Sequence, residues 1–182
     1  KQAMNQGYEV VEFINGNTSL KPADEPLLEE KFKGLPDPDV ERFLAKVQSN
    51  VPLFAELNTL LLREMMLDSE VHAPKPGDTI FEREEFTNTF YTIVEGSVDI
   101  LIDPNDPNEV VTLGQGEFFG EMGLIAGRPR TATVKAKTPC ILLETNRRTM
   151  IKLINSVAEV KAVIDQTAIV RQIQTYLAPE VS

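Results

Sequence analysis

The feature that most limits the fold of this chain is a series of short apolar segments within residues 71–145, each ended by turn residues. Residues 90–94 read FYTIV and end in the reversal Glu-Gly-Ser, after which apolar side chains alternate at Val98, Ile100 and Ile102. Short strands roughly eight to twelve residues apart, with turn signals between them, are typical of antiparallel sandwiches and jelly rolls. We therefore expect a mainly β protein with flanking helices, in which residues 71–145 form an antiparallel double-stranded β-helix (jelly roll).

Helical patterns flank this region on both sides. Residues 37–70 are expected to form a helical lead-in, with Asp39 capping a helix over residues 40–49 and a second helix over residues 58–67. Residues 146–178 are expected to form two C-terminal helices, the first capped by Asn146 and the longer second ended by Pro179. Apolar positions on the longer helix cover more than one stripe. It could therefore pack on the roll, on a second copy in a homodimer, or partly on both.

Residues 1–36 lack such a clear pattern. They contain an extended stretch over residues 8–14, two prolines and several acids. We interpret them as an N-terminal arm or linker, with a small independent strand pair as the alternative, and residues 37–182 as one domain. Because the chain begins with Lys1 rather than Met, we expect it to be a piece of a longer polypeptide.

The stretch EFFGEMGLIAGRPRTATV, residues 117–134, contains an arrangement that ordinary core packing does not explain. Residues 121–124 have room for about one helical turn, which begins at or near Gly120 and is ended by Gly127 and Pro129. The first amides of a helix lack partners within it and lie at the positive end of its dipole. An anion can bind there, and glycine lets it approach the backbone closely.

Arg130 and Glu121 indicate which anion this is. Arg130, placed just after Pro129, could reach back to the same anion with a two-pronged charge-assisted bond. A phosphate would repel Glu121 unless that carboxylate accepted a hydrogen bond from a neighbouring hydroxyl, and a sugar hydroxyl beside a phosphate indicates a nucleotide. Taken singly, such an Arg and Glu are commonly a weak surface pair. The joint order of Gly, Glu, Pro, Arg and a small hydroxyl residue favours the nucleotide.

The strings FGEMGL and RPRTATV, separated by a short gap, resemble the phosphate-binding cassette of the cyclic-nucleotide-binding domain family. That family includes bacterial catabolite activators, cyclic-nucleotide-dependent kinases and cyclic-nucleotide-gated channels. The strings PGDTIF and FYTIVEGSVDI resemble its opening strands. The resemblance covers roughly residues 51–177 and is strongest over residues 114–134.

The resemblance implies roles for individual residues of this sequence. Gly120 and Met122 would offer backbone amides to the ligand, Glu121 would bind the ribose 2′-hydroxyl, and Arg130 would bind the exocyclic phosphate oxygens. The full set of expected ligand-contact positions is Gly120, Glu121, Met122, Gly123, Arg130, Thr131 and Ala132.

The sequence specifies the purine base of the ligand less tightly than the phosphate and the ribose. Thr131 could bond the phosphate or, with the purine in syn, the amino group of guanine, yet the family also includes cyclic AMP binders with Thr at this position. We therefore favour cyclic AMP slightly over cyclic GMP. Val111 and Leu113 are expected to line the base pocket, with Tyr176 or Ile173 from the last helix as a lid.

These residues predict a cyclic-nucleotide-binding regulatory module, which converts ligand binding into movement of the C-terminal helices and so controls an attached or partner protein. The helix-turn-helix that follows the roll in bacterial activators has no counterpart here, so we expect any effector domain to lie outside this chain. The alternative is a jelly-roll scaffold that binds no cyclic nucleotide and serves dimerisation or docking.

No catalytic or metal-binding set can be assembled from the sequence. His72 is the single histidine, which leaves neither the several ligands of a cupin-type metal site nor a Ser-His-Asp or Cys-His set. Cys140 lies in an apolar segment and is expected to be a buried small apolar side chain. We therefore predict no enzyme activity, no metal and no cofactor besides the cyclic AMP or cyclic GMP ligand.

Charge and composition argue against two further kinds of partner. The net charge is −10, whereas proteins that bind duplex nucleic acid usually carry a basic patch, so nucleic-acid binding is not expected. No apolar run approaches the ~20 residues that a membrane span needs. The single cysteine is compatible with a reducing cytosol, and we expect a cytoplasmic protein.

Overall fold

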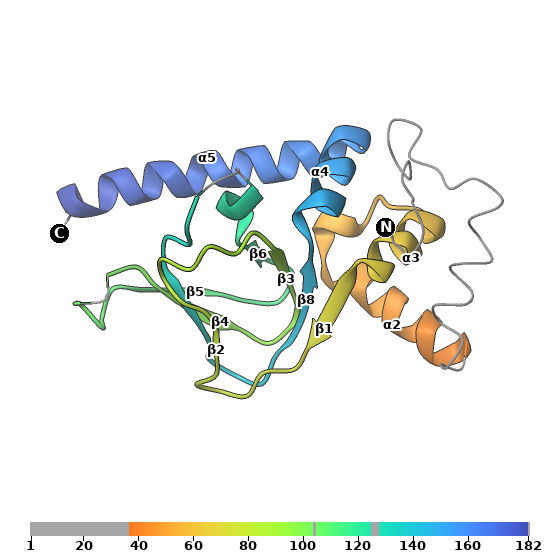
Figure 1. Cartoon of the computed structure of the whole chain (residues 1–182), viewed down its shortest axis with the longest axis horizontal. Helices are drawn as coiled ribbons and strands as arrows, with labels where there is room; N and C mark the ends of the chain where they lie inside the picture. The colour runs from red at the N-terminus through yellow and green to blue at the C-terminus, as the bar shows by residue number, and fades with distance from the viewer. Residues whose placement is uncertain (1–36, 104, 125–127, 182) are drawn as a thin grey trace.

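The computed structural model describes residues 37–103, 105–124 and 128–181 of the 182-residue chain, with side chains over residues 38–174 of those ranges. The expected arm over residues 1–36 lies outside the described residues. In the described part, helices from both ends of the chain pack against a β-roll (Figure 1).

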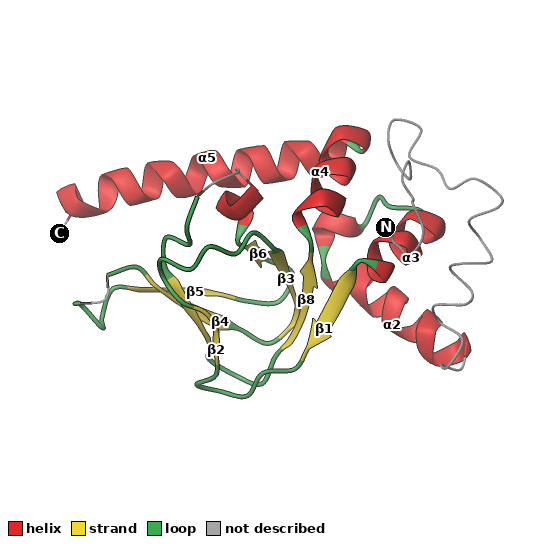
Figure 2. Ribbon diagram, in the orientation of Figure 1, coloured by secondary structure: helices red, strands yellow, loops and turns green. Residues whose placement is uncertain are grey.

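Within the described residues, eight strands pair into two antiparallel sheets of four (Figure 2). The first sheet has the order β1-β8-β3-β6, with the bounds Ser69–His72, Ile141–Thr145, Phe90–Glu95 and Phe118–Phe119. The second has the order β2-β7-β4-β5, with the bounds Thr79–Phe81, Thr133–Ala136, Val98–Leu101 and Val110–Leu113. This antiparallel roll with flanking helices confirms the expected fold class.

Strand β3 is buried from Phe90 to Val94 because it separates two cores. Successive side chains of a strand point to opposite faces. Tyr91 and Ile93 pack in one cluster with Phe119, between the two sheets. Phe90 and Val94 pack on the other face, in a cluster with the apolar side chains of the helices. This arrangement accounts for the unbroken burial of residues 90–94, where a half-exposed strand would alternate between buried and exposed side chains.

The helical lead-in consists of α2 (Asp37–Asn50), the short helix η2 (Pro52–Phe54) and α3 (Thr59–Leu67). The expected cap at Asp39 is wrong. The helix α2 begins at Asp37, so Asp39 lies in its first turn and forms an ion pair with Arg42. Acidic side chains are favourable there because the helix dipole is positive at that end.

The C-terminal helices are α4 (Arg147–Ser156) and α5 (Ala158–Val181). Asn146 caps α4 as expected, its side chain accepting the Thr149 amide at 2.8 Å. The expected end of the last helix at Pro179 is wrong, because α5 continues to Val181. A proline this close to a helix end removes one backbone hydrogen bond and leaves the preceding turns intact.

Gly96 and Gly77 form a matched pair for a test of the packing at the turns of the roll. Their φ angles are +92° and +93°. A Cβ on Gly96 would overlap the Pro139 carbonyl oxygen and lie 2.9 Å from Cys140 Cα, whereas a Cβ on Gly77 would meet nothing within 4 Å. We expect Gly77→Ala to lower the free energy of unfolding by about 1 kcal/mol through backbone strain. We expect Gly96→Ala to lower it by roughly 2–4 kcal/mol because overlap is added. Urea denaturation measures both losses, and equal losses would contradict this packing.

Candidate functional site

The predicted cassette follows β6 and leads into β7. Its short helix is η3 (Glu121–Leu124), a 3-10 helix, and Gly120 precedes it with a φ of +86°. The Gly123 amide bonds back to the Gly120 carbonyl at 3.0 Å, which leaves the amides of the first turn without partners inside the helix. The single short turn expected at Gly120 is therefore present. Gly127, expected to end it, lies outside the described residues.

Arg130 lies buried beside this turn, with 5% of its surface exposed. Its Nε donates to Thr87 Oγ1 at 2.8 Å, and its Nη2 donates to the Thr89 carbonyl at 2.8 Å and to Thr89 Oγ1 at 3.2 Å. The guanidinium carbon lies 4.0 Å from the centre of the Phe81 ring. Hydrogen bonds donated to two threonines and contact with an aromatic face thus fix the orientation of the guanidinium.

One nitrogen of this guanidinium, Nη1, is buried and has no hydrogen-bond partner among the described residues. It faces the glycines of the cassette turn. A Cβ on Gly120 would lie 3.0 Å from Nη1, and a Cβ on Gly123 would lie 2.8 Å from it. The two glycines therefore make room for the Arg130 side chain. A buried donor without a partner costs about 1–3 kcal/mol, and more when it is charged, so this site favours a group that supplies an acceptor oxygen.

Glu121 is also buried, its side chain 7% exposed. Arg171 of α5 donates from Nη1 to Glu121 Oε1 at 2.7 Å and from Nη2 to the Phe118 carbonyl at 2.7 Å. Sequence reasoning missed Arg171. A signal was present, because Arg171 follows the buried Ile164 by seven residues, about two helical turns, and so lies on the same face of α5.

The other predicted ligand-contact residues differ in how deeply they are buried. Met122 is half-buried, Thr131 is exposed, and Ala132 is buried. Of the positions expected to line the base pocket, Leu113 is buried but Val111 is 44% exposed. Of the two lid candidates, Ile173 is 51% exposed, and the side chain of Tyr176 lies outside the described residues. The structure thus brings Arg130 and the cassette glycines together and leaves Val111 and Ile173 at the surface.

A polar network connects Arg130 with side chains of β1, β3 and β8 in the first sheet. Thr89, which accepts from Arg130, is hydrogen-bonded to Glu144, and Tyr91 and His72 are bonded to the same carboxylate. Burial alone would raise the pKa of Glu144, but the hydrogen bonds from Thr89, His72 and Tyr91 lower it below its ordinary value. The carboxylate therefore stays ionised and supports the neighbours of Arg130.

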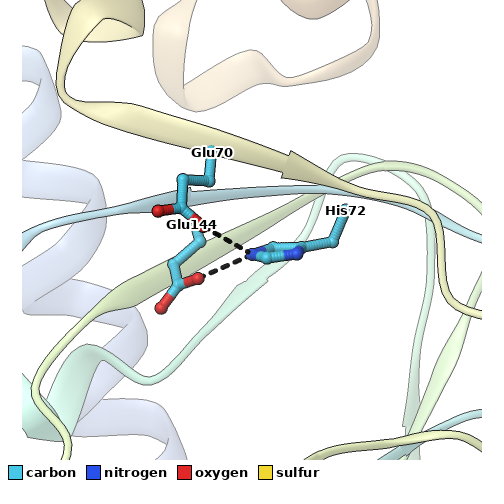
Figure 3. Close-up of side chains that lie close together, drawn as sticks. All are labelled: Glu70, His72 and Glu144. Atoms are coloured by element: carbon cyan, nitrogen blue, oxygen red, sulfur yellow. Dashed lines mark hydrogen bonds and ion pairs between the residues drawn. The ribbon is translucent and has the colours of Figure 1, made fainter.

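His72 has partners that sequence reasoning missed. Its Nε2 lies 2.6 Å from Glu144 Oε1 and 3.7 Å from Glu70 Oε1 (Figure 3). The register of β1 on β8 pairs Glu70 with Glu144 and so brings His72 close to Glu144, which lies 72 residues further along the chain. The three ligand atoms lie within 4.8 Å of one another, so they could hold a cation. The bonds among these side chains already account for the cluster without an ion.

Cys140 is buried, with 4% of its surface exposed, as the sequence predicts. Its Sγ donates to the carbonyls of Ser97 and Thr138 at 3.1 and 3.2 Å. Burial raises the pKa of the Cys140 thiol above its ordinary value. The residue is a structural thiol rather than a nucleophile.

A family model described as the cyclic nucleotide-binding domain matches residues 72–157, which include every predicted ligand-contact residue of the cassette. This segment of the chain is thus similar to the cyclic nucleotide-binding domain family. No helix of the described residues has the length and apolar character needed to cross a membrane.

Individual relatives agree with the family match. A cyclic nucleotide-gated potassium channel of Mesorhizobium japonicum is 36% identical over 122 residues, which cover 67% of this chain and 33% of the channel. The chain thus spans about a third of the length of the curated channels it matches. A regulatory subunit of a cAMP-independent protein kinase A from Trypanosoma brucei is 25% identical, with a TM-score of 0.57 over 75% of this chain and 51% of that chain. The Thermus thermophilus catabolite activator protein shares the fold at 23% identity, with a TM-score of 0.59 over 71% of this chain and 62% of that chain.

The polar network around Glu144 can be tested through Tyr91, because the titration of this side chain makes the stability of the fold depend on pH. Burial and the charge of Glu144 raise the pKa of Tyr91 to about 12. Because the folded state holds this proton more tightly than the unfolded state, the contribution of Tyr91 to stability is fully present below pH ~10 and is lost as the pH rises towards 12. We expect the stability difference between the wild type and Tyr91→Phe to shrink over that range. Urea denaturation at several pH values measures it, and a constant difference would contradict the network.

Proposed function

We propose that this chain is a cyclic-nucleotide-binding regulatory module, with cyclic AMP slightly favoured over cyclic GMP as its ligand. The observation that carries the proposal is the buried Nη1 of Arg130, which lacks a partner among the described residues and faces Gly120 and Gly123. The match of residues 72–157 to the model of the cyclic nucleotide-binding domain supports it.

The phosphate is assigned to Arg130 on chemical grounds. A cyclic phosphodiester carries one negative charge and two exocyclic oxygens, so a single oxygen can accept the unused N–H and neutralise the buried cation at once. The Thr87 and Thr89 bonds hold the guanidinium in place before the ligand arrives. A donor that is already oriented loses less side-chain entropy on binding, which favours affinity.

Glu121 is assigned to the ribose. A carboxylate accepts hydrogen bonds at both oxygens, so Oε1 can bind Arg171 while Oε2 accepts a ribose hydroxyl. The assignment of the base rests on less. Thr131 is exposed, and it is free to serve either purine. The similar kinase subunit of Trypanosoma brucei belongs to a cAMP-independent enzyme, so the ligand of this chain must be identified by direct titration.

The regulatory output is assigned to the C-terminal helices, because both contact the cassette turn. Arg147 of α4 donates from Nε to the Leu124 carbonyl at 2.8 Å, and Arg171 of α5 binds Glu121. A ligand that moves η3 by a fraction of an ångström would therefore bias the positions of both helices. We propose that this movement controls an attached or partner protein, and that the module itself reads a ligand without catalysing a reaction.

Isothermal titration with cyclic AMP and with cyclic GMP tests the proposal. Saturable binding is expected, and Arg130→Gln should weaken it by ~2–5 kcal/mol, or roughly thirty- to several-thousand-fold in affinity, because one partner of a buried charge pair is lost. Arg128→Gln is the matched control, because Arg128 is two residues away and exposed. Circular dichroism confirms that each variant is folded. Equal affinity of the wild type and a folded Arg130→Gln would remove the phosphate assignment, and no binding to the wild type would remove the proposed function.

The alternative function is a scaffold for dimerisation, and one surface favours self-association in either case. Val163, Ile169, Val170 and Ile173 of α5 are 42–56% exposed and fall within about 120° of one another around the helix. Val160 and Ile164, which pack against the rest of the fold, lie on a separate face. We propose that the exposed stripe pairs with the same stripe of a second copy.

Sedimentation equilibrium tests this pairing. We expect the wild type to form dimers and the double variant Val170→Glu with Ile173→Glu to be a monomer, because paired carboxylates would be buried in the contact. Gln172→Glu places the same charge on an exposed position outside the stripe and should still dimerise. A wild type that remains monomeric at high concentration would contradict the pairing. A dimer that binds neither nucleotide would favour the scaffold.

A further inference from the structure

Strand register places a histidine and two glutamates together at the β1 edge of the first sheet. Glu70 and Glu144 are cross-strand partners, and His72 follows Glu70 by two residues, so all three side chains lie on one face of the sheet. Figure 3 shows both carboxylates directed at the same ring nitrogen. One imidazole and two carboxylates thus bring their ligand atoms to within 4.8 Å of one another.

The hydrogen bonds of this cluster satisfy one carboxylate better than the other. His72 Nε2 can carry a single proton, which at 2.6 Å serves Glu144 Oε1. Glu70 Oε1 lies 3.7 Å from the same nitrogen, which is beyond hydrogen-bond distance. Like charges directly opposite each other on neighbouring strands are destabilising. A divalent cation can bind both carboxylates and the ring nitrogen at once, which a single proton cannot do.

The distances within the cluster are close to those that a tetrahedral metal ion requires. Zinc binds imidazole nitrogen and carboxylate oxygen at about 2.0–2.2 Å, so two of its ligand atoms lie roughly 3.3 Å apart. The distances from His72 Nε2, 2.6 Å to Glu144 Oε1 and 3.7 Å to Glu70 Oε1, lie on either side of this value. Side-chain shifts of less than about 1 Å would therefore complete the geometry. The Glu70 side chain is 77% exposed, so it is free to shift and the ion can enter from solvent.

Glu144 is supported in the way that metal-binding carboxylates usually are. The side chains of Thr89 and Tyr91 are hydrogen-bonded to it, in addition to His72. Such neighbours fix the direction of a ligating carboxylate, and the loss of one weakens metal binding. The cluster therefore offers an oriented carboxylate, an imidazole and an exposed carboxylate. Three protein ligands leave the fourth position of a tetrahedral ion to water.

We propose that Glu70, His72 and Glu144 form a binding site for a divalent transition-metal ion such as zinc. An imidazole among carboxylates suits zinc, whereas magnesium and calcium prefer oxygen ligands alone. The ion would join the edge strand β1 to β8. From the sequence we expected no metal, because the chain has one histidine and its partners reach it only through strand register. The proposal goes beyond the proposed function and does not depend on nucleotide binding.

Isothermal titration of the untagged full chain with zinc chloride tests the site. We expect saturable binding of one ion per chain and no binding of magnesium. His72→Gln should weaken zinc binding by more than about a hundredfold, because losing a ligand costs more than losing a residue that orients one. Glu70→Gln should weaken it by at least about tenfold, because an amide oxygen lacks the carboxylate charge. Glu56→Gln makes the same change on an exposed glutamate outside the cluster and should leave the affinity unchanged.

The single histidine of the sequence provides a second measurement. In NMR spectra of the chain with isotope-labelled histidine, zinc should shift the signal of the one imidazole. An imidazole signal that stays in place at saturating zinc would overturn the proposal, and so would equal zinc affinity of the wild type and Glu70→Gln. The absence of saturable zinc binding by the wild type would do the same. If circular dichroism shows that His72→Gln does not fold, Glu70→Gln and the imidazole signal decide, because the Glu70 side chain is largely exposed.

Discussion

The structure of the site depends on the burial of one arginine. A guanidinium removed from water must have its donors satisfied, and the protein satisfies those of Arg130 at Nε and Nη2 but leaves Nη1 without a partner among the described residues. Keeping a charged donor in this condition is costly. A binding site can tolerate the cost in the empty state, because the ligand removes it on binding. The unused donor therefore points to an anionic ligand more directly than the exposed charges of the surface do.

The fold positions this arginine through contacts that are remote in sequence. Phe81 at the end of β2 supports its face, Thr87 and Thr89 before β3 accept its hydrogen bonds, and the cassette glycines leave room for Nη1. Its backbone bonds the turn after β2, with Arg130 N donating to Glu85 O at 2.7 Å. Arg130 thus connects the cassette directly to the strands of the roll. The helices α4 and α5 each contact the cassette turn through one arginine.

The sequence could predict what is local. Strand spacing indicates the roll, and the order of residues from Gly120 to Arg130 indicates a turn with an arginine beside it. The pairings that depend on strand register or helix packing could not be predicted. The bond of His72 with Glu144 spans 72 residues and that of Arg171 with Glu121 spans 50. The helical repeat places Arg171 on the same face of α5 as Ile164, but no sequence spacing identifies the partner of either residue. The expected helix boundaries at Asp39 and Pro179 were wrong, because cap and breaker residues are weak signals beside the packing of a long apolar face.

The crystal structure of the chain saturated with cyclic AMP tests the central claim most directly, because it locates the acceptor of the unused donor. The claim predicts an exocyclic phosphate oxygen within about 3 Å of Arg130 Nη1, with the ribose 2′-hydroxyl bonded to Glu121. A ligand bound elsewhere on the chain, or a phosphate in the cassette that leaves Nη1 without an acceptor, would contradict it.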